Sequence, residues 1–141
     1  MTTSRDVMTK NPACAVPEDS VADVARLMKD KDVGPVPIVE SHDSKKLIGI
    51  VTDRDLAIKV VAEGRDPQST RVRDVMTSDV VTCRDDDDIN VALNAMSTHQ
   101  LRRIPVVDNG NMLLGIIAQA DIATRMNEPA KTGEVVKEIS E

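Results

Sequence analysis

The sequence predicts an α/β protein built from two copies of one β-α-β-β-α unit. The pentapeptide Arg-Asp-Val-Met-Thr occurs at residues 5–9 and again, unchanged, at residues 73–77. An apolar run that contains one glycine and ends in a charged turn occurs at residues 47–57 and, in a weaker form, at residues 113–123. A repeat of this length is too long for a solenoid and fits two copies of a small α/β unit.

In each copy the pentapeptide leads into a short strand, predicted at residues 14–16 and 80–83, and then into an amphipathic helix. Ser20 precedes the first helix and Asp23 stands at capping-box spacing, which marks the helix start. Four aspartates, residues 85–88, precede the second helix. They lack the glycine and distal glutamate of an EF-hand loop, so we expect them to stabilise the helix N-terminus. The apolar stripes are Val21, Val24, Ala25, Leu27 and Met28 in the first copy, and Ile89, Ala92, Leu93 and Met96 in the second.

Two further strands and a second helix complete each copy. The next strands are predicted at residues 34–39 and 102–107, and their prolines favour an edge position or a strand entry. After polar hairpin loops, the apolar runs form the last strands, and the first of them continues into a helix from Asp53. The apolar face expected for that helix holds Leu56, Ile58, Val60 and Val61.

These elements give predicted domain boundaries. We expect a first unit at residues 1–65, a linker at 66–72, a second unit at 73–128 and a C-terminal tail at 129–141. In the tail Val135, Val136 and Ile139 have helical spacing, which favours a terminal helix.

Composition excludes several classes of function. The chain has 141 residues, a net charge of −6 and no Phe, Tyr or Trp. Without a basic patch or aromatic stacking residues, nucleic-acid binding is disfavoured. No apolar run reaches the roughly 20 residues of a membrane span, and no signal-peptide pattern begins the chain. We therefore expect a cytoplasmic protein with neither a nucleic-acid nor a membrane partner.

Catalytic and metal motifs are not found in the sequence. Cys14 and Cys83 form no CxxC pair, and His42 and His99 are isolated. Two reduced thiols are expected, although a metal-linked redox site that uses both cysteines and a histidine stays open. Because no catalytic triad, P-loop or zinc-protease motif occurs, we expect no catalytic residues, no bound metal and no enzyme activity.

Three repeated landmarks make the chain resemble the cystathionine-β-synthase (CBS) domain family. They are Val-Met-Thr at the start of each copy, a proline-centred second strand, and a glycine followed after three residues by Thr or Ser and after six by Asp. The last pattern is complete at Gly49, Thr52 and Asp55. The resemblance extends from about residue 7 to residue 126. It implies a stand-alone CBS pair, or Bateman module, whose two units pack with pseudo-two-fold symmetry.

Members of the family commonly bind AMP, ADP, ATP or S-adenosylmethionine in clefts between their units, and act as sensors without a catalytic cofactor. The resemblance implies that Asp55 accepts hydrogen bonds from the ribose diol and that Thr52 donates to a phosphate. Arginines before the proline of the other copy, here Arg102 and Arg103, would contact the phosphates. The first cleft would comprise Thr9, Val33, Val36, Ile50, Thr52, Asp55, Arg102 and Arg103.

The second cleft is expected to be weaker. There Ala118 replaces the threonine, and Gly34 and Pro35 stand where arginines would be needed. Its predicted residues are Thr77, Ile104, Ile116 and Asp121.

Two alternatives remain open at this point. Thr52 and Asp55 also have the spacing of a plain helix cap, and the arginines could pair with a carboxylate of the partner unit. The main hypothesis is an adenosine-ligand sensor that forms a homodimer and signals to a downstream protein through its shape or its partner affinity. The alternative is a ligand-free, homo-oligomeric interaction protein with vestigial clefts.

Overall fold

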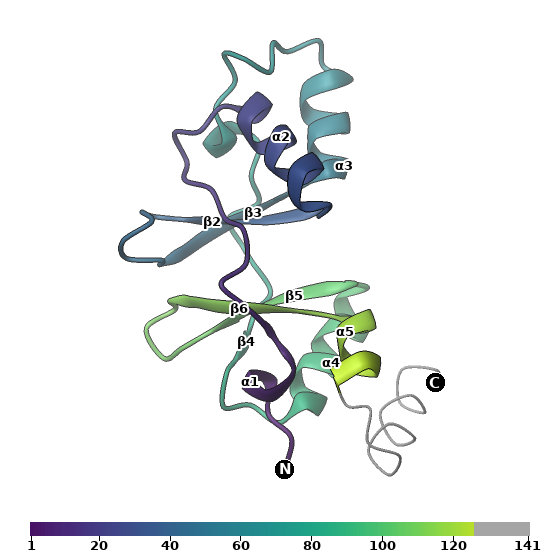
Figure 1. Ribbon diagram of the computed structural model, residues 1–141. Coiled ribbons are helices and arrows are strands. Elements are labelled where there is room, and N and C mark those ends of the chain that lie inside the picture. Colours follow the sequence, from purple (N-terminus) through teal and green to yellow (C-terminus); the bar gives the residue numbers. More distant parts are fainter. Residues whose placement is uncertain (126–141) are drawn as a thin grey trace. The chain divides into compact units, whose positions relative to one another are not determined.

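A computed structural model describes residues 1–125 as two compact units (Figure 1). One unit is Ala13–Val80, and the other combines Met1–Pro12 with the chain from Val81 onward. The compact units therefore differ from the sequence repeats. The boundaries predicted at residues 65 and 73 follow the repeats. Each pentapeptide is part of the unit formed by the other repeat. The tail predicted at residues 129–141 lies outside the described residues.

The unit Ala13–Val80 is a two-stranded antiparallel sheet covered by helices. Strands β2 (Pro35–Val39) and β3 (Leu47–Thr52) form the hairpin, and the strand predicted at residues 14–16 is reduced to a parallel bridge between Ala15 and Ile38. Figure 1 shows helices α2 (Val21–Lys31) and α3 (Asp53–Leu56) on the same face of this sheet. A π-helical turn, η1 (Ala57–Val61), continues α3, and a 3₁₀ turn, η2 (Val72–Asp74), precedes the second Val-Met-Thr.

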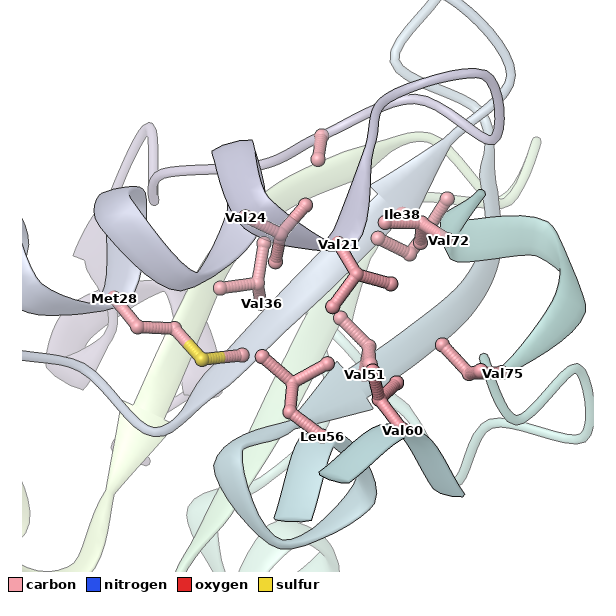
Figure 2. Packing of buried hydrophobic residues seen from close by; sticks show 11 residues of the cluster. Val21, Val24, Met28, Val36, Ile38, Val51, Leu56, Val60, Val72 and Val75 are labelled. Carbon is pink, nitrogen blue, oxygen red and sulfur yellow. The ribbon is translucent and has the colours of Figure 1, made fainter. Parts of the chain in front are cut away.

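Aliphatic side chains from all these elements form one core. Figure 2 shows Val21, Val24 and Met28 of α2 packed with residues of β2, β3, α3, η1 and η2. The predicted start of α2 is confirmed, because Ser20 Oγ accepts a hydrogen bond from Asp23 N at 3.1 Å. The Asp23 carboxylate turns instead to Arg26, at 2.7 Å, so only one half of the predicted capping box is visible here. The predicted linker supplies two further caps: Pro67 O accepts from Ala22 N, and Thr70 O accepts from Val21 N.

The helix after β3 differs from the sequence prediction at two apolar positions. Leu56 and Val60 are buried as expected, but Ile58 is 46% exposed and Val61 is 74% exposed. The reason is the π-helical turn, in which Ala62 N donates to Ala57 O five residues earlier. This wider turn breaks the 3.6-residue spacing on which the predicted apolar face depended.

The second unit is built on a four-stranded sheet in the order β1-β6-β5-β4. Helices α4 and α5 lie on one face of it (Figure 1), and a short helix, α1, precedes β1. Within residues 1–125 the helices are too short or too polar to cross a lipid bilayer. The elements are α1 (Ser4–Val7), β1 (Thr9–Lys10), β4 (Cys83–Arg84), α4 (Ile89–His99), β5 (Arg103–Val107), β6 (Leu113–Ala118) and α5 (Gln119–Arg125).

The position of Pro105 differs from the prediction. The sequence placed this proline at a sheet edge or a strand entry, but β5 lies between β6 and β4. However, β4 pairs only with Val106 and Val107, so Pro105 has no β4 residue opposite it. Its missing N–H therefore interrupts no ladder on that side.

The predicted stabilisation of the start of α4 is confirmed at Asp88, and two of the other aspartates stabilise the turn before the helix. Asp88 caps the helix by accepting from Asn90 N at 2.9 Å, and Asp87 accepts from Arg84 N at 2.8 Å. Asp85 forms an ion pair with Arg5, which attaches the first pentapeptide to this turn.

Candidate functional site

The turn between β3 and α3 carries the predicted threonine and aspartate in a closed capping box. Asp55 Oδ2 accepts from Thr52 N at 2.9 Å, and Thr52 Oγ1 accepts from Asp55 N at 3.1 Å. Both hydrogen bonds form because the chain enters α3 from an extended residue, with Thr52 at φ −118° and ψ 163°. In the capping box the Thr52 hydroxyl only accepts a hydrogen bond, through its oxygen. Its hydroxyl proton is not used in the box.

A residue that the sequence analysis missed completes the surroundings of Asp55. Lys59 Nζ lies 3.4 Å from Asp55 Oδ1 and donates to Val75 O at 3.0 Å. The Asp55 side chain is 19% exposed, whereas that of Lys59 is 42% exposed. The four-residue spacing of opposite charges on one helix would have identified this pair.

The second pentapeptide lies beside the same turn. Ile50 and Thr77 exchange two backbone hydrogen bonds, with N···O distances of 2.9 and 2.8 Å. Gly49 permits this approach, because a β-carbon there would lie 2.7 Å from Met76 Sδ and 3.1 Å from Thr77 O. The unit Ala13–Val80 therefore brings Ile50, Thr52, Asp55 and Thr77 into one region.

The other unit contains a counterpart with different contacts. Thr9 pairs with Ile116 across β1 and β6, as Thr77 does with Ile50. Thr9 Oγ1 donates to Asp121 Oδ2 at 3.4 Å. Because Ala118 replaces the threonine, this turn cannot form the side-chain half of a capping box that Thr52 provides.

The two pentapeptide threonines are therefore exchanged relative to the predicted clefts. Thr9 was assigned with Asp55, but the structure places it beside Asp121 in the other unit. Thr77 was assigned with Asp121, but it pairs with Ile50 in the unit that contains Asp55. The physical reason is that each pentapeptide packs against the glycine-containing strand of the opposite repeat, where the glycine leaves room for it.

The apolar residues predicted for the two clefts divide into two groups. Val36 and Ile104 are fully buried core residues, so their side chains are not available to a ligand. Val33, Ile50 and Ile116 are only half-buried. For Ile50 and Ile116 this follows from the strands, because in β3 and β6 buried residues alternate with partly exposed ones.

Arg102 and Arg103 are exposed and belong to the unit that contains Asp121. Arg103 starts β5 and pairs with Ala118, and Arg102 O accepts from Gln119 N at 3.1 Å. Within their own unit the two arginines therefore stand next to the second strand-to-helix turn. Their predicted role toward a phosphate stays a prediction.

The two cysteines have different surroundings. Cys83 is 3% exposed, and burial raises the pKa of its thiol to about 11. Cys14 is half-buried, and Lys45 Nζ lies 3.7 Å from its Sγ. No group of three or more His, Cys, Asp or Glu residues within residues 1–125 is arranged to hold a metal ion.

The surface of the described units is hollowed in at least two places. One, of about 470 Å³, is lined by Ile58, Lys59, Glu63, Arg65 and Asp74. Another, of about 510 Å³, lies at the ends of β4 and β5 and is lined by polar residues that include Arg84 and Asn109. Arg84 donates to Asn109 Oδ1 at 2.7 Å there.

Comparison with known proteins places these features in a wider group. The family model described as CBS domain matches residues 5–62 and 72–128. The CBS domain-containing protein YhcV of Bacillus subtilis is 36% identical over 140 residues, which cover 99% of this chain and 96% of YhcV.

Three crystal structures share the fold. Hypoxic Response Protein I, with two coordinated zinc ions, has a TM-score of 0.79 at 33% identity, covering 87% of this chain and 98% of its own. The CBS domain pair of protein MJ0100, in complex with 5-methylthioadenosine and S-adenosyl-L-methionine, has a TM-score of 0.76 at 28% identity and coverages of 88% and 94%. CBSX2 in complex with AMP has a TM-score of 0.76 at 28% identity and coverages of 88% and 95%.

Proposed function

The chain belongs to the CBS domain family, and on that basis we propose that it is a regulatory protein that binds an adenosine-containing ligand through Asp55 and Thr52. The role proposed is binding without catalysis. Binding would act by favouring one of two conformations of the protein, which a downstream partner distinguishes.

The proposal rests on the hydrogen-bond acceptor positions that remain available on the Asp55 carboxylate. Its two oxygens offer about four acceptor positions. One is used by Thr52 N and one faces Lys59 Nζ, so about two remain. Two hydroxyl groups on adjacent carbons, as in a ribose, supply two donors at a spacing that suits one carboxylate.

The neighbouring residues suit the remainder of such a ligand. Ile50 presents a half-buried apolar side chain beside the turn, and the backbone near Thr77 is held next to it. Because the chain has no aromatic residue, an adenine ring would contact aliphatic side chains. The Thr52 hydroxyl can donate to a phosphate while its oxygen still caps α3.

The structural relatives narrow the class of ligand. MJ0100 is in complex with 5-methylthioadenosine and S-adenosyl-L-methionine, and CBSX2 with AMP. All three molecules contain adenosine. We therefore propose AMP, ADP, ATP or S-adenosylmethionine as the ligand of this chain, bound more tightly at Asp55 than at Asp121.

Ultraviolet absorption offers a direct test, because a chain without Trp, Tyr or Phe absorbs little near 260–280 nm. Untagged protein, freed of nucleic acid, would be precipitated with acid and the supernatant analysed by mass spectrometry. Calorimetric titration of the ligand-free protein with AMP, ATP and S-adenosylmethionine would follow. Binding of one of them supports the proposal, and silence with all three contradicts it.

A second function is favoured by one specific observation. Thr52 and Asp55 cap α3 through hydrogen bonds to each other's backbone, so both residues have a structural role. In addition, Ile58 and Val61 expose apolar surface on η1. A ligand-free, homo-oligomeric interaction protein is therefore the alternative. This alternative predicts a homodimer that Val61→Ser weakens, measured by light scattering, together with no binding in the titrations with AMP, ATP and S-adenosylmethionine.

A further inference from the structure

Resting on the proposed function, we propose that Lys59 is a positioning residue that sets the preference of this site for ribose over deoxyribose. The lysine ammonium lies by one oxygen of the Asp55 carboxylate, and the capping box uses the other. Lys59 adds a residue to the site that none of the repeated landmarks contains.

The ammonium group of Lys59 has two partners. Its Nζ lies 3.4 Å from Asp55 Oδ1 and 3.0 Å from Val75 O. Val75 is 1% exposed, so its carbonyl oxygen belongs to a buried residue of the core. A long side chain that is held at both partners has lost most of its rotamer freedom in the folded protein. The ammonium can therefore define a direction for the carboxylate.

Each oxygen of the Asp55 carboxylate has a different partner. Oδ2 is anchored by Thr52 N at 2.9 Å and Oδ1 by Lys59 Nζ. With a partner on each oxygen, rotation of the carboxylate plane is restricted, and one acceptor position on each oxygen stays available. A pair of adjacent hydroxyl groups needs this arrangement, whereas a single hydroxyl can follow a rotated carboxylate. Loss of the lysine should thus reduce the benefit of the second hydroxyl.

Positioning of Asp55 by Lys59 differs from phosphate binding. Lys59 Nζ already has a carboxylate and a carbonyl oxygen as partners, so its ammonium is directed toward Asp55 and Val75. A residue that bound phosphate would change the affinity for every phosphorylated ligand equally. A residue that only stabilised the fold would do the same. Only a positioning role changes the ratio between ribose and deoxyribose ligands.

The test compares AMP with 2′-deoxy-AMP by calorimetric titration. Both carry the same base and phosphate, so general changes in charge or stability cancel in the ratio of their dissociation constants. Loss of one hydrogen bond to a charged group typically costs about tenfold or more in affinity, and we expect the wild-type protein to prefer AMP by roughly that factor. We expect Lys59→Met to reduce the preference by about threefold or more.

Two variants serve as controls. Lys59→Arg keeps a cation that can reach both partners, and it should retain most of the preference. Lys46→Met removes the same charge directly before β3, roughly 20 Å along the strand from Thr52, and should leave the ratio unchanged.

Each result has a distinct meaning. A reduced ratio in Lys59→Met that Lys59→Arg restores supports the inference. A wild-type preference for AMP that survives in Lys59→Met overturns the inference and leaves the proposed function standing. A wild-type protein that binds neither nucleotide overturns the inference, whereas the proposed function is overturned only if ATP and S-adenosylmethionine also fail to bind.

Discussion

Gly115 lies so close to Thr9 that a β-carbon on the glycine would come within 2.7 Å of the threonine carbonyl oxygen. It would also lie 2.6 Å from Met8 Sδ. The sulfur can move, but the carbonyl oxygen belongs to the backbone of β1, which pairs with β6 at this point. The glycine is therefore what allows the first pentapeptide to pair with β6.

We accordingly expect Gly115→Ala to destabilise the protein by about 1–3 kcal/mol, the usual cost of overpacking. Urea unfolding would measure the change in the free energy of unfolding. Gly110→Ala is the matched control, because the nearest atom to a β-carbon there is 3.5 Å away, an ordinary contact. Equal losses in both variants would contradict the argument from close approach.

The ion pair between Arg5 and Asp85 predicts a pH-dependent stability. Hydrogen bonding to the Arg5 guanidinium lowers the pKa of Asp85 below its usual 3.8. A carboxyl whose pKa is lower in the folded state stabilises the fold above its unfolded pKa, and that contribution is lost as the pH falls through the folded value. Arg5→Met should therefore be less stable than wild type at pH 7, and the difference should shrink below about pH 4.

Urea unfolding at pH 7 and at pH 3 would follow this effect. Arg73→Met provides the control, because its pair with Glu18 is more exposed, with 52% and 64% of the two side chains accessible. We expect that variant to change stability little at either pH. A difference between Arg5→Met and wild type that is the same at both pH values would rule out the role of Asp85.

The two cysteines should react at different rates with an alkylating reagent. Burial raises the pKa of the Cys83 thiol to about 11, so below that pH it stays protonated, and only the thiolate is nucleophilic. The half-buried Cys14 is accessible in comparison. Mass spectrometry after iodoacetamide treatment at pH 8 should show one label in folded protein, on Cys14, and two labels in urea. Rapid labelling of Cys83 in the folded protein would disagree with its burial.

The two aspartates should contribute unequally to ligand binding. In Asp55→Asn the amide oxygen can still accept from Thr52 N, but the second carboxylate oxygen is gone. We therefore expect a loss of AMP affinity of at least about tenfold with a nearly unchanged melting temperature. Asp121→Asn should reduce total AMP binding far less in the same titration. The opposite ranking would mean that the site containing Thr9 and Asp121 is the principal one.

Much of the fold could be predicted because its signals are local. Ser20 marks the start of α2 by a side-chain hydrogen bond within four residues, and the apolar stripe at Val21, Val24 and Met28 reports directly on the buried face. The same holds for the strand-to-helix turn, where Thr52 and Asp55 lie three residues apart. Such features depend on sequence neighbours and need no knowledge of tertiary packing.

The exchange of the pentapeptides could not be predicted in this way. Thr9 and Asp121 are 112 residues apart, and nothing in the repeat shows that Thr9 pairs with the distant copy. The exposure of Ile58 and Val61 was missed for a different reason, since a π-helical turn changes the spacing without any mark in the sequence. Lys59 could not be predicted from the repeated motif, because that motif ends at Asp55.

Each compact unit combines segments of both sequence copies, and this has an evolutionary consequence. Duplication of an ancestral gene segment would give two copies, yet each compact unit here takes its pentapeptide from one copy and most of its sheet from the other. Neither copy could be moved by recombination as a self-sufficient segment, because it would carry away the pentapeptide that the other unit needs and leave behind the one that packs on its own sheet. Inheritance of the pair as one block would then follow from the way the chain folds.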